Sequence, residues 1–97
     1  MIKENYEPFD EEKKEEKRIT KKFLKELLRS DLQLYYVTPS LNDVLYLHFK
    51  GFKRIENLKE FVNVKVIYFE GNCIQKIEGL ENLELLTCLY LHQNMIE

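Results

Sequence analysis

The sequence is poor in glycine and cysteine, the residues on which phosphate-binding loops, disulfide frameworks and many zinc sites depend. Its three glycines, Gly51, Gly71 and Gly79, are isolated turn residues, so there is no glycine-rich phosphate loop. The two cysteines, Cys73 and Cys88, are fifteen positions apart, form no Cys-x-x-Cys pair and have no histidine at zinc-finger spacing. We therefore expect reduced thiols, no metal site and no cofactor.

Long apolar runs and an excess of positive charge are also missing. No run approaches the roughly 18 apolar residues that span a bilayer, and residues 1–10 lack the apolar core of a secretory signal. A formal net charge of −2 gives no electrostatic basis for binding nucleic acid, which needs many contacts from Lys and Arg to phosphate. These absences favour a cytoplasmic protein without membrane or nucleic-acid partners.

A charged stretch at the start of the chain predicts a disordered leader over residues 1–18. Its i,i+4 pairs carry like charges, as in Glu11/Glu15 and Lys13/Lys17, and such pairs destabilise a helix. Pro8 lies just upstream and apolar residues are scarce, which favours a solvated segment. The alternative is that this stretch of mixed charge serves as a binding arm.

Residues 19–41 are predicted to form an N-terminal cap made of a helix and a strand. Thr20 is a suitable helix N-cap, and the apolar residues after it recur on one helical face: Phe23, Leu24, Leu27 and Leu28. Leu32 to Val37 indicates an extended strand, which Thr38-Pro39 ends because a residue before proline avoids the α region. Such a cap would cover the apolar end of a repeat array.

Residues 42–97 follow a 22-residue step that carries Leu45 onto Ile67 and Leu89. The same step aligns further residues: Tyr46 with Tyr68 and Tyr90, Leu47 with Phe69 and Leu91, Phe52 with Ile74 and Ile96, and Asn72 with Asn94. This is the strand-and-turn pattern of leucine-rich repeats. The sequence therefore predicts an α/β leucine-rich-repeat solenoid with 22-residue repeats and parallel strands on its concave face.

The repeats differ from one another in ways that predict their places in the array. Residues 42–63 form a degenerate first copy, because Asn42 stands at an apolar position and Lys50 replaces the asparagine of the turn. The return segment Ile77-x-x-Leu80-x-x-Leu83 has a period near three, which favours 3₁₀ or short helical turns. We expect about two and a half repeats, incomplete at the C-terminus, and hence a piece of a longer solenoid or an end that something else covers.

Two columns of side chains are predicted to point outward from the strands, because alternate strand residues face opposite sides. They are Tyr46, Tyr68 and Tyr90 in one column and His48, Glu70 and His92 in the other. The outer histidines would have backbones nearly 10 Å apart, so a zinc site is not expected from them. Acid–base catalysis is not expected either, because no nucleophile stands beside them and no pocket is implied. The tyrosines and their neighbours are the candidate protein-binding residues, because tyrosine offers a large amphipathic surface. The alternative is that tyrosine only supports the sheet.

The sequence from Ile19 onward resembles the N-terminal part of the leucine-rich-repeat axonemal dynein assembly factors. The residues that carry the resemblance are the Ile-Thr-Lys-Lys-Phe-Leu-Lys run at 19–25, Thr38-Pro39, the run from Leu41 to Leu58, and Asn72-x-Ile74-Gln75-Lys76-Ile77-Glu78. The return segments are shared with a wider group of short-repeat proteins that includes the protein phosphatase 1 regulators. Gly79 departs from the asparagine found at the equivalent Asn57.

The resemblance implies a non-enzymatic interaction scaffold for the cytoplasmic preassembly of dynein arms, associated with the cilium or flagellum. It implies dynein chains or assembly co-chaperones as partners, and further repeats beyond those in this sequence. Two alternatives stay open: a generic leucine-rich-repeat adaptor such as a phosphatase regulator, and a truncated product without function.

Overall fold

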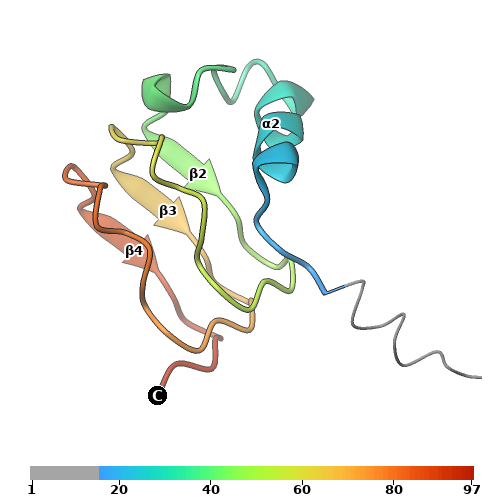
Figure 1. The fold of residues 1–97 in the computed structure, drawn as a ribbon, viewed down its shortest axis with the longest axis vertical. Helices are drawn as coiled ribbons and strands as arrows, with labels where there is room; N and C mark the ends of the chain where they lie inside the picture. The colour runs from blue at the N-terminus through green and yellow to red at the C-terminus, as the bar shows by residue number, and fades with distance from the viewer. Residues whose placement is uncertain (1–15) are drawn as a thin grey trace, which may run out of the picture.

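The computed structural model describes residues 16–97, and most of the predicted leader, residues 1–15, lies outside this range. Helix α2 spans Lys21–Ser30 and is followed by a 3₁₀ helix, η1, over Pro39–Leu41. Three short strands come next: β2 (Val44–Tyr46), β3 (Val66–Tyr68) and β4 (Cys88–Tyr90). They pair in parallel in the order β2-β3-β4, with α2 on the β2 side (Figure 1). Residues 16–97 thus form a small α/β domain of three parallel strands and one α-helix.

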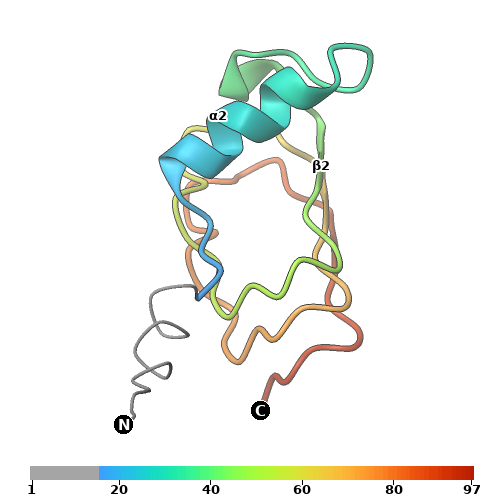
Figure 2. The same cartoon turned by 90° about the vertical axis from the view of Figure 1, so that its right-hand side faces the viewer.

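The register of the sheet follows the 22-residue step of the sequence. Val44 pairs with Val66 and Val66 with Cys88, while Leu45 pairs with Ile67 and Ile67 with Leu89. Parallel strands need a long connection, and here each connection is a wide loop instead of a helix, so that successive loops lie behind one another (Figure 2).

The return segments close on themselves through tight turns, as the period near three predicted. Phe61 donates its N–H to the carbonyl of Leu58 at 3.0 Å, and Val64 donates to Phe61 at 3.1 Å. The next loop repeats both bonds: the N–H of Leu83 donates to the carbonyl of Leu80, and the N–H of Leu86 donates to the carbonyl of Leu83. Each bond joins a residue to the third one before it, so each return segment contains two single hydrogen-bonded turns and no continuous 3₁₀ helix.

The core fills the space between the sheet and the return segments. Alternate residues of the strands and of the segments directly after them point into it and are fully buried: Leu45, Leu47, Ile67 and Phe69. The return segments add Phe52, Ile55, Leu58 and Phe61. Burial decreases toward β4, where Leu89 is only partly buried, because no element among residues 16–97 covers the far side of β4.

Helix α2 covers the opposite end of this core, beside β2. The Thr20 side chain accepts the N–H of Phe23 at 3.0 Å, which confirms the predicted N-cap. Leu24 and Leu28 are buried, and the Phe23 ring meets the Phe52 ring edge-to-face at 5.3 Å. This packing closes the β2 end of the core.

None of the helices described is long and apolar enough to cross a membrane.

The strand predicted over Leu32–Val37 is wrong: this segment forms a turn and then an irregular stretch. The cause is local hydrogen bonding by Asp31, whose side chain accepts the N–H of Gln33 and whose carbonyl accepts those of Leu34 and Tyr35. Further along, the Asn42 side chain binds both the N–H and the carbonyl of Tyr36, each at 2.9 Å. The Tyr36 backbone groups are thereby satisfied without a neighbouring strand.

Asn72, the asparagine of the repeat, joins successive turns. Its Oδ1 accepts the N–H groups of Lys50 and Phe52 at 3.1 and 3.0 Å. Its Nδ2 donates to the carbonyls of Leu47 and Phe69 at 2.9 and 2.8 Å. Asn94 makes equivalent bonds one step later, to Ile74, Phe69 and Leu91. These bonds hold each loop to the one before it.

Candidate functional site

The three predicted tyrosines form one stack across the outer face of the sheet, which we call the tyrosine column (Tyr46, Tyr68 and Tyr90). The rings of Tyr46 and Tyr68 lie 5.0 Å apart and those of Tyr68 and Tyr90 lie 4.7 Å apart, both pairs within 10° of parallel. The register of the strands places them directly beside one another. Tyr46 and Tyr68 are partly exposed and Tyr90 is 38% exposed, so the stack presents an aromatic surface to solvent.

Tyr35 completes the column at the β2 edge and was missed by the sequence analysis. Its hydroxyl accepts the N–H of Tyr46 at 3.1 Å, and the two rings meet edge-to-face at 6.4 Å. Tyr35 is only 4% exposed, and this burial raises the pKa of its hydroxyl. A side chain therefore satisfies an edge N–H of β2 for which residues 16–97 provide no neighbouring strand.

The second predicted column, His48, Glu70 and His92, lies just past the ends of the strands. Parallel pairing continues there, because the Phe49 N–H donates to the backbone carbonyl of Glu70 at 3.0 Å and the Gly71 N–H donates to that of His92 at 3.1 Å. The His48 ring lies near both Tyr46 and Tyr68, with centroids 6.2 and 6.4 Å away. The His92 ring lies 6.5 Å from that of Tyr90. All six predicted residues thus belong to one continuous surface.

Two polar atoms of this second column are shielded from solvent without a hydrogen-bond partner: Nδ1 of His48 and Oε1 of Glu70. Buried polar atoms are usually satisfied, so each such exception needs an explanation. Within residues 16–97, no group of three or more His, Cys, Asp or Glu side chains is arranged to hold a metal ion.

Phe49 is a second residue that the sequence analysis missed. It is 65% exposed and has a φ of 53°, a left-handed conformation that is rare for a bulky residue. The 22-residue step explains the backbone, because Gly71 and Gln93 occupy equivalent positions and also have positive φ. The Phe49 ring lies over Gly71, and a Cβ added to Gly71 would be 2.1 Å from this ring. The centroids of the Phe49 and His48 rings are 5.6 Å apart. An exposed aromatic side chain thus borders the His48 end of the surface.

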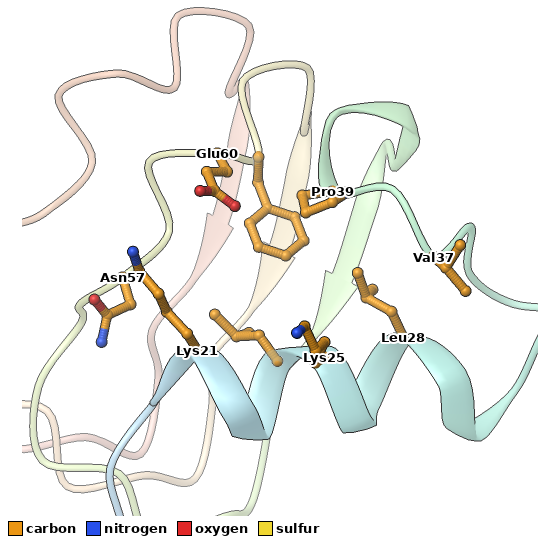
Figure 3. Close-up of a pocket in the computed structure, with 9 residues that line it drawn as sticks. Lys21, Lys25, Leu28, Val37, Pro39, Asn57 and Glu60 are labelled. Atoms are coloured by element: carbon orange, nitrogen blue, oxygen red, sulfur yellow. The ribbon is translucent and has the colours of Figure 1, made fainter.

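A cavity of about 320 Å³ lies between α2 and the return segment near Asn57. Its walls are largely apolar, formed by Leu24, Leu28, Val37, Pro39 and Phe61. Lys21 and Lys25 project from the helix at its edge, and Glu60 lies on the other side with Asn57 (Figure 3). None of its lining residues belongs to the tyrosine column, so the cavity is a separate feature.

Over the described residues, the fold and the tyrosine column define a small α/β domain of three parallel strands and one α-helix that carries a stacked aromatic surface. The chain is similar to proteins named dynein axonemal assembly factor 1. It is 52% identical over 59 residues to the Drosophila erecta homolog, which is 61% of this chain and 4% of that protein. It is 53% identical over 51 residues to the rat and mouse proteins, which is 53% of this chain and 8% of each of them.

These relatives confirm the resemblance to axonemal dynein assembly factors. The matched segments span only a small part of each relative. The names of the relatives do not mention leucine-rich repeats, and the matches themselves do not show them. No family model matches the chain, and no solved structure matches it.

Proposed function

We propose that this chain is part of a leucine-rich-repeat solenoid that acts as a non-enzymatic interaction scaffold in the assembly of axonemal dynein. The proposed setting is the cytoplasm of cells that build motile cilia, where dynein arms would be preassembled. The observation that carries this proposal is the aromatic surface of the tyrosine column in a chain that is 52–53% identical to dynein axonemal assembly factors over 51 to 59 of its residues.

The repeated contacts of the fold support the solenoid. The same 22-residue step governs the strand register, the tight turns of the return segments and the Asn72 and Asn94 bonds. Each step contacts only its neighbour in the sheet, which is how repeat arrays are built. Partly buried Leu89, together with Met95 and Ile96, which are 56% and 37% exposed, would be covered by a further repeat.

The chemistry of the tyrosine column supports protein binding. Stacked tyrosines are already ordered against one another, so a partner that contacts them loses little side-chain entropy on binding. Their rings supply apolar area and their hydroxyls supply hydrogen bonds, the combination that is enriched in interface hot spots. His48, Glu70 and His92 border the rings with polar groups, as the rim of an interface does.

A pull-down from ciliated-cell extract, followed by mass spectrometry, tests this proposal. The baits are the 97-residue chain, a Tyr46/Tyr68/Tyr90→Ala variant, and Tyr36→Ala as a matched control, since Tyr36 is 64% exposed and lies outside the column. Circular dichroism verifies that each bait is folded. Dynein chains or assembly co-chaperones recovered by the unmodified and Tyr36→Ala baits alone are the expected result. Equal recovery by the triple variant would contradict it, and a phosphatase subunit in stoichiometric amounts would favour the adaptor alternative.

A further inference from the structure

Glu70 carries a carboxylate that no cation within residues 16–97 neutralises. The ion pairs there join Arg18 to Glu56 and Lys76 to Glu78. One oxygen of Glu70, Oε1, is shielded from solvent and accepts no hydrogen bond, although the residue as a whole is half-buried. Withholding a carboxylate oxygen from both water and donors is unfavourable. A partner that brings a donor to Oε1 as the Glu70 side chain rotates outward therefore gains free energy that a neutral surface would not offer.

His48 offers a second unpaired acceptor beside the first. The hydrogen bond from the Phe49 N–H to the Glu70 carbonyl keeps the two segments paired at this point, and paired parallel strands lie about 4.8 Å apart. In the tautomer that carries its proton on Nε2, the unpartnered Nδ1 of His48 is an acceptor as well, and it too becomes accessible to a partner when its side chain rotates outward. A ligand with several donors in one rigid group suits two acceptors carried by neighbouring paired segments.

Aromatic rings frame the two acceptors. The His48 ring has Phe49 at 5.6 Å, Tyr46 at 6.2 Å and Tyr68 at 6.4 Å. The faces of Phe and Tyr rings attract cations within about 6 Å. Phe49 is 65% exposed on a left-handed backbone, so its ring is open to a partner that approaches from solvent.

We propose that Glu70 and His48, framed by Phe49 and the tyrosine column, receive an arginine side chain of the protein partner. This inference rests on the proposed function and specifies the chemistry of the same surface. Arginine fits because its guanidinium carries five donors in one plane and stacks on aromatic rings, whereas lysine presents a compact, strongly hydrated charge. The Glu70 carboxylate repels a phosphate or an acidic side chain.

Titration of the 97-residue chain with Nα-acetyl-arginine methylamide at low ionic strength tests the assignment. The readout is the set of aromatic NMR signals of His48, Phe49 and Tyr68, and the neutral citrulline analogue serves as the matched ligand. We expect saturable shifts with the arginine probe in the millimolar range and none with citrulline. Glu70→Gln should weaken the binding about tenfold, the value of one charge-assisted hydrogen bond, and added salt should weaken it further.

Glu84→Gln is the control variant, because Glu84 is exposed on a return segment and its replacement changes the net charge equally. Unchanged binding in Glu84→Gln with loss in Glu70→Gln supports the proposal. The same titration is repeated with Nα-acetyl-lysine methylamide. Equal shifts with the citrulline analogue or with this lysine analogue, or undiminished binding in Glu70→Gln, would overturn the proposal. If Glu70→Gln keeps the dynein-related partners in the pull-down while the triple tyrosine variant loses them, the proposed function stands and the arginine assignment fails.

Discussion

Arg18 and Glu56, 38 positions apart, form a two-point ion pair: Nη2 of Arg18 lies 2.6 Å from Oε1 and Nε lies 3.1 Å from Oε2. A planar guanidinium matches a carboxylate in this way. The pair fixes the chain just before Ile19, which is fully buried and whose carbonyl accepts the Asn57 Nδ2 at 2.7 Å. It therefore holds the start of the α2 segment against the first return loop.

The Arg18–Glu56 pair predicts a specific loss of stability in acid. The hydrogen bond from Arg18 lowers the pKa of Glu56 below its ordinary 4.5. Between the folded and unfolded pKa values the unfolded chain binds more protons, so this contribution is complete above about pH 4.5 and is lost as pH falls through the folded value. Urea midpoints measured from pH 7 to pH 3 should therefore fall more for the unmodified chain than for Arg18→Met. Parallel curves for the two proteins would contradict the linkage.

Asn72→Ala should destabilise the chain more than the same change at Asn94, its equivalent one repeat later. The change leaves the N–H groups of Lys50 and Phe52 and the carbonyls of Leu47 and Phe69 without their side-chain partner. Unsatisfied buried groups cost about 1–3 kcal/mol each, and partial access of water reduces the sum, so we expect about 3 kcal/mol or more. Asn94→Ala is the matched comparison, because Asn94 is less buried. Chemical denaturation that ranks the two variants equally would contradict this account.

Tyr35→Phe should expose the edge of β2 while keeping the packing of the ring. The variant removes the oxygen that accepts the Tyr46 N–H, which costs about 1 kcal/mol as a typical net hydrogen bond. Hydrogen exchange should show faster exchange of the Tyr46 amide, with the amide of Tyr68 as the internal control. An unchanged Tyr46 exchange rate would mean that the hydroxyl does not protect this edge.

Gly71→Ala should disturb Phe49 as well as its own backbone. The new Cβ would lie 2.1 Å from the Phe49 ring, and the φ of 73° is unfavourable for alanine by about 1–2 kcal/mol. We expect a loss of about 2–3 kcal/mol in the free energy of unfolding. The double variant Gly71→Ala/Phe49→Ala should lose less than the sum of the two single variants, because the clash is gone. Strict additivity in a double-mutant cycle would refute the contact.

The geometry of the tyrosine column was predictable from sequence because it depends on one period. A 22-residue step places Tyr46, Tyr68 and Tyr90 at the same register, and parallel pairing then stacks their rings. The Asn72 and Asn94 bonds were predictable for the same reason. The binding role of the tyrosine column stays a prediction.

The contacts outside the period could not be predicted in this way. Leu32 to Val37 has the composition of a strand, but the Asp31 and Asn42 side chains satisfy its backbone locally. Tyr35 contributes one hydrogen bond through its hydroxyl, and Phe49 has a left-handed backbone conformation. A pattern of apolar residues predicts neither feature. The one available signal for Phe49 was its alignment with Gly71, a residue type that favours positive φ.

Site-specific photo-crosslinking in ciliated cells tests the central claim most directly, namely that the tyrosine column binds a protein of dynein assembly. The photoreactive residue p-benzoylphenylalanine would replace Tyr68 in one protein and the exposed Tyr36 in the other. The account predicts adducts with dynein chains or their assembly co-chaperones from position 68 and none from position 36. Adducts from position 36 alone, or the same adducts from both positions, would contradict it.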